Sequence, residues 1–392
     1  MIPLMKSAFL NEHETKEELA KFILRTSRFS MSKECVRFEE EFAAFQDAKE
    51  AILFNSGSSA NLAMLQTLKN IGRLRDRAKV GFSALTWPTN LMPIIQLGLE
   101  PVPLDCETTT LNVMSHHLEE RLRKDSEIQA MFITNAMGFA GDLATIRQIC
   151  NQRGIILIED NCEGLGSELP SGRTGSFGEM ASFSFFVAHH MSTVEGGMVC
   201  TDDEELAEML RIVRANGWDR NLTAVQQHKW RKKYDVHSEF DAKYTFYDLS
   251  YNFRPTEITG FLGCYQLQFL KDNIAAREAN YLALESIVKE NPDLVTLDHS
   301  HISVLSSFAF PVVCKSRELR EIYLSQFSGA GVEIRPMIAG SIQKQPFYKK
   351  YISTPYELPG TDNIDQCGFY CGNYPELTEA DLQTISSCLG KY

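Results

Sequence analysis

The chain has 392 residues, 44% of them hydrophobic and 23% charged, with a formal net charge of −12 at pH 7. This composition excludes a disordered or fibrous protein, and the length allows a large core divided between two lobes. The acidic balance argues against binding to a nucleic acid backbone, which requires basic patches.

Membrane and disulfide-stabilised classes are also disfavoured by the sequence. No run approaches the ~20 apolar residues that cross a bilayer, and no sustained apolar stretch follows Met1, so neither a membrane span nor a signal peptide is expected. The ten cysteines are scattered, and Cys367 and Cys371 lack the two-residue gap of zinc and redox motifs. We therefore expect reduced thiols, no bound metal, a cytoplasmic location, and no membrane or nucleic acid partner.

Short apolar strands alternate with amphipathic helices over the first 250 residues. Strands are predicted at residues 51–54, 79–82, 101–104, 130–134 and 155–158. Most of them are continuously apolar, which is typical of parallel strands covered by helices on both faces. A helix ending near residue 68 follows the first strand, and another spans residues 145–153. The pattern predicts an α/β fold with a mixed, largely parallel sheet flanked by helices.

The character of the chain changes after Pro255. One long helix is predicted over residues 256–289, with Pro255 near its start. A strand at residues 304–313 and helices at 318–327 and 378–389 follow. We therefore predict a large domain over residues 1–255 and a smaller α+β domain over residues 256–392.

Three features in the first domain are individually weak. Residues 55–61, Asn-Ser-Gly-Ser-Ser-Ala-Asn, lie between a strand and a helix, where free N–H groups and the helix dipole can bind a phosphate, although such a turn can equally just cap the helix. Asp160 follows a strand at the edge where α/β sheets bind ligands, and could pair with a protonated pyridine nitrogen or cap a helix. Trp87 could stack on a flat ring or simply fill the core.

Residues 184–197, Ser-Phe-Phe-Val-Ala-His-His-Met-Ser-Thr-Val-Glu-Gly-Gly, give these features their meaning. The segment resembles the one in which the vitamin-B6-dependent sugar aminotransferases (the DegT-like family) carry the lysine that binds their cofactor covalently. The lysine position falls on His189, and no lysine occurs between Lys124 and Lys229. An imidazole forms no stable covalent bond of this kind with an aldehyde, but it can accept and donate protons near neutrality.

The motifs occur in the family's order, and the resemblance runs from Ser27 to about Asn373. It implies a fold-type-I aminotransferase-like fold, in which residues 1–255 bind pyridoxal 5′-phosphate or its amine form, pyridoxamine 5′-phosphate. The implied cofactor contacts are Gly57, Ser58 and Ser184 to the phosphate, Trp87 and Glu163 to the ring, Asp160 to the pyridine nitrogen, and Asn252 from a neighbouring subunit. A homodimer with shared sites is therefore expected.

Within the family, the histidine is similar to that of nucleotide-sugar 3-dehydratases. Some of these bind an iron–sulfur cluster through a Cys-x-Cys pair, which this chain lacks, so no cluster is expected. The resemblance implies removal of the C3 hydroxyl from a nucleotide-linked 4-keto-6-deoxy sugar such as GDP-4-keto-6-deoxymannose, as in the synthesis of the lipopolysaccharide sugar colitose. His189 would take a proton from the cofactor's C4′ carbon and return it to the leaving hydroxide.

The resemblance also implies residues for the substrate and for the amino donor, expected to be L-glutamate. These are Ser27, Arg28, Phe29, Ser30, Asn216, Arg220, Arg254 and Glu333, with Arg254 on a donor carboxylate. Two positions depart from the pattern, because Asn216 and Tyr374 stand where histidines are expected. The first departure leaves the donor and the exact sugar open. Two alternatives also remain: an ordinary aminotransferase that uses Lys229 or Lys232, and a regulator that binds the cofactor without catalysis.

Overall fold

The structure, a computed structural model, describes residues 1–391. Its largest element is a seven-stranded sheet with the order β1-β9-β8-β5-β4-β2-β3. The strands are β1 (Glu50–Phe54), β2 (Lys79–Ser83), β3 (Glu100–Leu104), β4 (Ile128–Thr134), β5 (Ile156–Asp160), β8 (Met180–Ser184) and β9 (Gly197–Thr201). All neighbours from β3 to β8 run parallel, whereas β9 is antiparallel to both β8 and β1. This mixed, mostly parallel sheet confirms the predicted α/β class.

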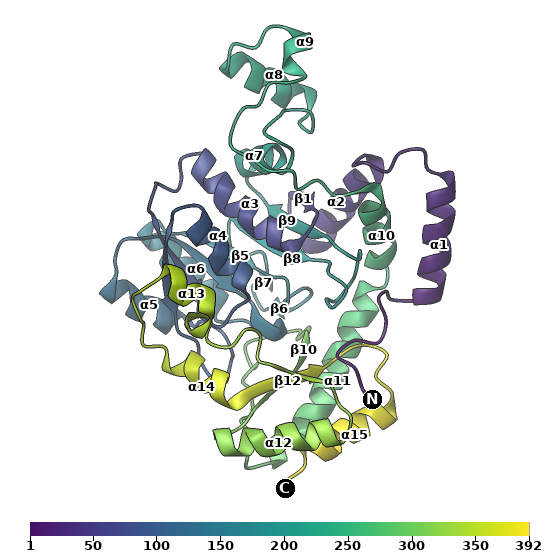
Figure 1. Cartoon of the computed structure of the whole chain (residues 1–392), viewed down its shortest axis with the longest axis vertical. Coiled ribbons are helices and arrows are strands. Elements are labelled where there is room, and N and C mark those ends of the chain that lie inside the picture. Colours follow the sequence, from purple (N-terminus) through teal and green to yellow (C-terminus); the bar gives the residue numbers. More distant parts are fainter. Residues whose placement is uncertain (392) are drawn as a thin grey trace.

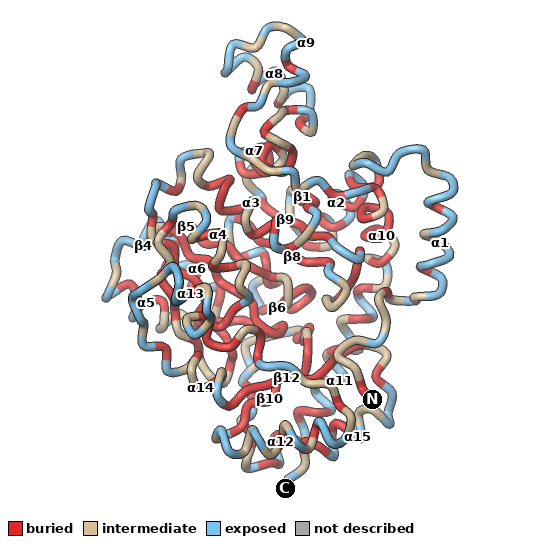
Figure 2. The backbone as a smooth tube through the Cα atoms, viewed as in Figure 1, coloured by how far each residue is buried: buried red, intermediate tan, exposed pale blue. Residues whose placement is uncertain are grey.

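Helices cover both faces of the sheet (Figure 1). On one face lie α3 (Gly57–Asn70), α4 (Pro88–Gln96) and α7 (Glu204–Arg214); on the other lie α2 (Lys33–Gln46), α5 (Ser115–Lys124), α6 (Leu143–Arg153) and α10 (Glu257–Leu267). In β1, Ile52 and Phe54 pack toward α3 and α7, whereas Ala51 and Leu53 pack toward α2. This two-sided burial explains why the strands are continuously apolar and form the buried centre seen in Figure 2.

The C-terminal part is built on α11 (Leu270–Glu290) and a three-stranded antiparallel sheet. The sheet has the order β10-β12-β11, formed by Ala309–Val313, Gly368–Gly372 and Ile334–Pro336, and it packs with α12 (Arg317–Gly329) and α15 (Glu379–Leu389). Helix α10 follows residue 255 but packs against α2 in the first lobe. The domain boundary at residue 255 therefore stays a prediction.

Two predictions for this region were wrong in detail. The helix expected over residues 256–289 is two helices, which separate at Gln268 and Phe269 because α10 packs on α2 whereas α11 packs in the C-terminal core. No proline or glycine marks the break. The strand expected over 304–313 begins only at Ala309, because the preceding buried serines turn their carbonyls toward other partners.

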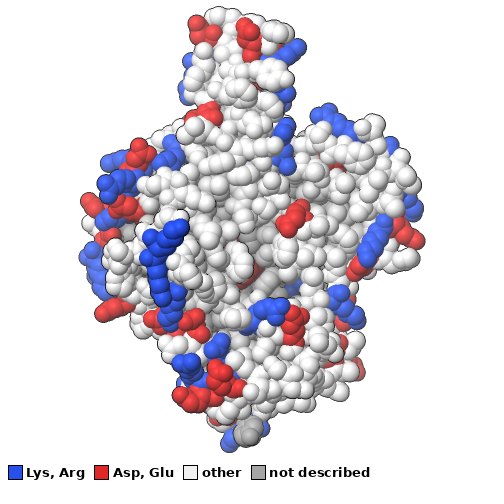
Figure 3. Space-filling model, in the orientation of Figure 1, with Lys and Arg blue, Asp and Glu red and all other residues white. Residues whose placement is uncertain are grey.

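The remaining elements lie at the edges of the molecule. α8 (Ala224–Lys233) and α9 (Glu239–Ala242) project from the body, and α1 (Glu12–Arg25) flanks α10 (Figure 1). The others are β6 (Glu168–Leu169), β7 (Gly172–Arg173), the 3-10 turns Ala136–Gly138 and Ile342–Lys344, α13 (Pro346–Tyr351) and α14 (Pro359–Cys367). Acidic and basic side chains are interspersed on the face shown in Figure 3. Within residues 1–391, no helix has both the length and the apolar character needed to cross a membrane.

Candidate active site

A cavity of about 390 Å³ opens where parallel strands of the large sheet end. Thr134, Asp160 and Ser184 are the last residues of the adjacent strands β4, β5 and β8, and all three line it. This is the edge at which α/β sheets bind ligands. The other lining residues are Ser56, Gly57, Ser58, Trp87, Thr89, Cys162, Glu163, Phe186, Ala188, His189, Glu195, Phe308, Ile338 and Tyr370. Every residue predicted to contact the cofactor from the same subunit is therefore in one place, and only Asn252 is absent.

One end of the cavity is formed by the start of α3. Ser56 caps the helix: its hydroxyl accepts a hydrogen bond from the Ser59 N–H (3.1 Å). The N–H groups of Gly57 and Ser58 remain, because the first turn of a helix has no intrahelical partner for them. A side chain on Gly57 would place its Cβ 2.7 Å from the Cβ of Ser184. The free N–H groups thus lie close to the Ser184 wall, which suits an anion held between them.

Two neighbouring carboxylates at the end of β5 have different environments. Glu159 is fully buried and accepts hydrogen bonds from the N–H groups of Gly175, Phe177 and Gly178 (2.7–2.8 Å), so it holds a loop. Asp160, on the opposite side of the strand, lines the cavity and accepts from Asn61 Nδ2 (2.8 Å) and from the Cys162 N–H (3.0 Å). Of these two carboxylates, only Asp160 can therefore pair with a group bound in the cavity.

Glu163 forms another acidic group of the cavity wall. One of its oxygens accepts a hydrogen bond from the Met137 N–H (2.8 Å). Burial raises the pKa of the Glu163 carboxyl to about 7, the nearby Asp160 charge adds to this rise, and the Met137 hydrogen bond opposes it. Near neutrality Glu163 can therefore be protonated and donate a hydrogen bond.

His189 lies in a turn after β8. The strand ends at Ser184, and the His189 N–H donates to the Phe186 carbonyl (2.9 Å). The imidazole packs against the Phe308 ring with centroids 5.2 Å apart, and its buried Nδ1 has no partner among residues 1–391. Burial, and secondly the Arg277 charge, lower the pKa of His189 to about 4. The neutral ring therefore offers a free lone pair as a base.

No lysine is among the described residues that line the cavity. Lys229, on α8, forms an ion pair with Glu208 (3.1 Å), and Lys232 lies on the same projecting helix. Neither lies where the aminotransferase alternative would need it.

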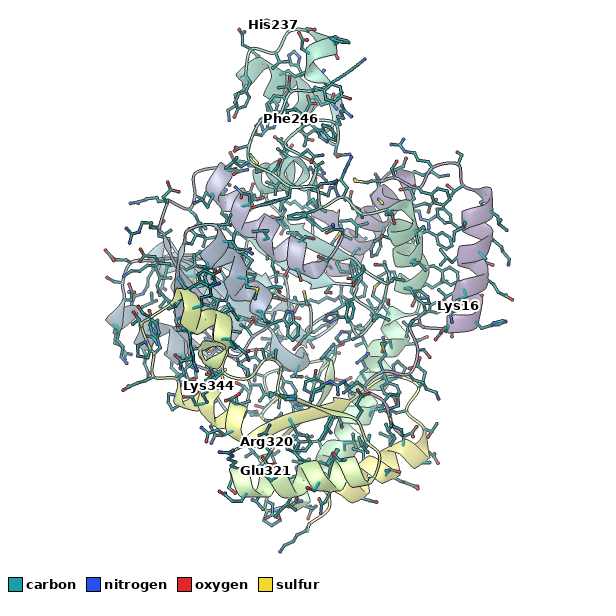
Figure 4. All side chains as sticks on the ribbon, viewed as in Figure 1. Lys16, His237, Phe246, Arg320, Glu321 and Lys344 are labelled. Carbon is teal, nitrogen blue, oxygen red and sulfur yellow. The ribbon has the colours of Figure 1, made fainter. Side chains whose placement is uncertain are left out.

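Four residues predicted for a neighbouring subunit or the substrate form a separate group. Arg220 and Arg254 lie 4.0 and 5.5 Å from the ring centroid of Trp218, Arg254 donates to Asn252 Oδ1 (2.9 Å), and Asn216 lies on the same segment. Trp218 also stacks on Phe246, at the base of the projecting part labelled in Figure 4. Arg220, Asn252 and Arg254 are exposed, and this Trp218 cluster does not line the cavity of its own chain.

The other predicted substrate residues lie at two further places. Residues 27–30, Ser-Arg-Phe-Ser, are exposed; Ser30 pairs with Thr256, and the Phe29 carbonyl accepts from the Glu257 N–H (2.9 Å). Glu333 accepts from the Leu4 N–H (3.0 Å) and pairs with Arg335 beside β12. The structure does not bring these residues into the cavity, so their roles stay predictions.

The cavity also includes residues that sequence reasoning missed. Phe308, Ile338 and Tyr370 come from the C-terminal part, and only the tertiary fold brings them to the strand ends. Thr89 and Cys162, by contrast, each follow a predicted site residue within two positions. Their closeness in sequence to Trp87 and Asp160 was the signal that could have identified them as site residues.

A group of possible metal ligands lies apart from the cavity, although no metal site was expected. The ligand atoms of Glu107, His116 and His117 are all within 4.8 Å of one another. His117 Nδ1 accepts a hydrogen bond from the Met114 N–H (3.2 Å), which fixes the proton of the neutral ring on Nε2. This capping bond opposes metal binding by His117.

The donor set of the cavity fits a phosphorylated pyridine ring. Free N–H groups of Gly57 and Ser58 lie near the Ser184 wall at one end, and the Asp160 carboxylate also lines the cavity. The His189 ring, whose Nδ1 has no partner among residues 1–391, lies near the rings of Phe186 and Phe308. Seven strands with this order, flanked by helices and carrying such a site, define a fold-type-I enzyme of the aminotransferase type that binds pyridoxal phosphate.

Comparison with known proteins gives the family. Residues 11–390 match the model of the DegT/DnrJ/EryC1/StrS aminotransferase family, and the chain belongs to it, as the sequence motifs predicted. The GDP-4-keto-6-deoxy-D-mannose 3-dehydratase of Escherichia coli O55:H7 (strain CB9615 / EPEC) is 31% identical over 356 residues, covering 90% of both chains. The enzyme of that name from Yersinia pseudotuberculosis is 30% identical over 94% of both chains.

A solved structure supports the same relationship. The crystal structure of a GDP-4-keto-6-deoxymannose-3-dehydratase with a trapped PLP-glutamate geminal diamine has a TM-score of 0.91 and 29% identity, and the match covers 99% of this chain and 100% of that one.

Proposed function

We propose that the chain is a pyridoxal-phosphate-dependent nucleotide-sugar 3-dehydratase. Its reaction removes the C3 hydroxyl of a nucleotide-linked 4-keto-6-deoxy sugar, with GDP-4-keto-6-deoxymannose as the proposed substrate, and gives a 4-keto-3,6-dideoxy sugar. The observation that carries the proposal is His189, which stands in the cavity at the position of the family's lysine, with no lysine in the wall. The similarity to two 3-dehydratases along the whole chain supports it.

The cavity would hold its cofactor without a covalent bond. Gly57, Ser58 and Ser184 bind the phosphate, Asp160 keeps the pyridine nitrogen protonated, and Trp87 packs on the ring. In its amine form the cofactor supplies an amino group for the C4 ketone and a ring that accepts electrons. Glu163, in its protonated form, would donate a hydrogen bond to a ring substituent.

His189 performs the proton transfers. As a neutral imidazole it removes the proton from the cofactor's C4′ carbon, and as an imidazolium it protonates the hydroxide that leaves the sugar's C3. A lysine here would instead bind the cofactor covalently and favour proton return to the sugar, which gives an amino sugar. One residue thus separates the two reactions.

The second subunit of a homodimer completes the site in this proposal. The Trp218 cluster is exposed and carries two arginines, and it does not reach its own cavity, which supports a role across an interface. Asn252 would contact the neighbour's cofactor phosphate, and Arg220 the nucleotide sugar. Arg254 would hold a carboxylate of L-glutamate, the amino donor; the PLP-glutamate adduct trapped in a relative supports this donor.

The test is product analysis by mass spectrometry. The protein is incubated with pyridoxamine phosphate, or with pyridoxal phosphate and L-glutamate, and with GDP-, CDP- and dTDP-linked 4-keto-6-deoxy sugars. We expect a product with one oxygen atom fewer, together with ammonia and, with glutamate, 2-oxoglutarate. A 4-amino sugar would indicate an aminotransferase, and binding without turnover a regulator; either result would overturn the proposal.

A further inference from the structure

Arg277 of α11 is a buried cation without an acidic partner. Its side chain is 4% exposed, and no carboxylate of residues 1–391 forms an ion pair with it. Its donors bind neutral oxygens instead: Asn273 Oδ1 (2.8 Å) and the carbonyls of Ser307 (3.4 Å), Phe308 (2.7 Å) and Asn373.

The stability of the fold does not by itself explain such an arrangement. A buried charge that lacks a counter-ion loses its hydration, and apolar residues of similar volume often stabilise a fold better than buried charges do. Burial lowers the pKa of Arg277 to about 10, and the nearby Glu376 opposes this fall. The guanidinium therefore stays charged near neutrality. Because this buried charge is unfavourable for folding, we look for its role in the neighbouring active site.

The neighbour of Arg277 is His189. A small cavity of about 20 Å³ behind the active site is lined by His189, His190, Asn273 and Arg277. Asn273, which Arg277 orients, donates to the His190 carbonyl. Arg277 also binds the carbonyl of Phe308, whose ring packs against His189. His189 lines both cavities, so it lies between the cofactor cavity and the small cavity that Arg277 also lines.

We propose that Arg277 is a positioning residue whose fixed charge controls the proton affinity of His189. The charge keeps the imidazole neutral before the reaction, and it makes the imidazolium a stronger acid, so that the proton passes quickly to the leaving hydroxide. This inference rests on the proposed role of His189 as the base. Arg277 contacts neither substrate nor cofactor and acts through His189 alone.

The groups around His189 favour this assignment. On the side of the cofactor cavity are Asp160, Cys162, Glu163, Glu195 and Tyr370, and on the other side are His190, Arg277 and Glu376. Carboxylates near an imidazole stabilise its charged form. Arg277 is the only permanent cation in this set and opposes them; burial first, and the Arg277 charge second, lower the pKa of His189.

The hydrogen bonds of Arg277 could also serve only to connect α11 to residues 306–308 and Asn373, so the test separates charge from hydrogen bonding. Arg277→Gln removes the charge and keeps donors, whereas Arg277→Lys keeps the charge. Asn373→Ala is the matched control, because Asn373 Nδ2 donates to the Arg277 carbonyl (3.0 Å) and carries no charge.

The measurement is the NMR titration of ¹³C-labelled histidine rings in the cofactor-free protein. His189 is identified among the nine histidines by its loss in His189→Asn. We expect Arg277→Gln to raise the titration midpoint of His189 by about one pH unit or more, and Arg277→Lys and Asn373→Ala to leave it near that of the wild type. An unchanged midpoint in a folded Arg277→Gln protein would overturn the inference.

A second variant covers a failure of Arg277→Gln to fold. Arg277→Met removes the charge and replaces it with an apolar side chain, a kind of change that is often neutral or stabilising for a buried charge. It should raise the His189 midpoint as Arg277→Gln does, and an unchanged midpoint in this variant would overturn the inference. The titration uses neither substrate nor cofactor. A shifted midpoint without sugar dehydration would therefore reject only the proposed function, and dehydration with an unmoved midpoint only this inference.

Discussion

In a Gly57→Ala variant, the added Cβ would clash with the opposite wall of the proposed phosphate site, which Ser184 and Cys162 form. This Cβ would lie 2.7 Å from Ser184 Cβ, 3.1 Å from Ser184 Oγ and 3.2 Å from Cys162 Sγ. Carbon atoms in contact are normally about 3.5–4.0 Å apart, so the start of α3 and the end of β8 would have to separate by roughly an ångström. The N–H groups of Gly57 and Ser58 would then move away from the Ser184 hydroxyl, and one phosphate could not contact both.

The size of the effect follows from this geometry. Forcing an extra methyl group into a well-packed site costs about 1–3 kcal/mol, which corresponds to a roughly 5- to 150-fold weaker affinity if it falls on cofactor binding. A part of the cost can fall on the cofactor-free fold. We therefore expect a Gly57→Ala protein that folds, binds pyridoxamine phosphate more weakly within this range, and regains activity at high cofactor concentration.

The assay is fluorescence or absorbance titration of the cofactor-free protein with pyridoxamine phosphate. Gly329→Ala serves as the matched control, because Gly329 ends α12 and nothing lies within 4 Å of the added Cβ. That variant should bind the cofactor as the wild type does. A Gly57→Ala protein with a dissociation constant within twofold of the wild type would refute the assignment of this turn as the phosphate site.

Three further outcomes are expected. His189→Lys should acquire the yellow absorbance of covalently bound cofactor, fixed to the chain by borohydride, and lose dehydration, whereas exposed His228→Lys should do neither; an unchanged His189→Lys would remove His189 from the mechanism. Asp160→Asn should lower the turnover rate on the order of 100-fold, because a neutral amide does not hold the ring nitrogen protonated, and a rate within threefold of the wild type would argue against that role. The carboxyl of Glu163 has its pKa raised from 4.5 to about 7, so the unfolded chain ionises first and stability falls as pH rises between these values. Glu163→Gln should therefore raise the melting temperature of the cofactor-free protein more at about pH 8 than at about pH 5, and equal gains would contradict the raised pKa.

Local patterns sufficed for the part of the site that strand ends and helix starts create. Asp160 and Ser184 end neighbouring strands, and Gly57 starts a helix, so sheet topology alone brings them together. Phe308 and Tyr370 carry no such signal. They reach the cavity because β10 and β12 pair across a long stretch of chain, which is a tertiary event that no periodicity encodes.

The buried Arg277 shows the same limit in a helix. It lies in the α11 segment Lys271-Asp-Asn-Ile-Ala-Ala-Arg277, whose mixture of charged, polar and apolar residues gives no sign that the arginine is buried. The side chain is buried because carbonyls of residues 307, 308 and 373 converge on it, and these carbonyls belong to irregular backbone whose course cannot be inferred from residue type. The break between α10 and α11 went unpredicted for a related reason, since the two helices differ in their partners and not in their propensities.

The exchange of lysine for histidine changes what the rest of the cavity must supply. A covalent bond would keep the cofactor in place even where other contacts were weak, whereas His189 contributes none. In the proposed function the affinity therefore comes from the start of α3, from Asp160 and from Trp87, which is 56% exposed. For this reason, changes such as Gly57→Ala should weaken cofactor retention more in this chain than in a relative that keeps the lysine. His189→Lys combined with Gly57→Ala should recover binding that Gly57→Ala alone loses.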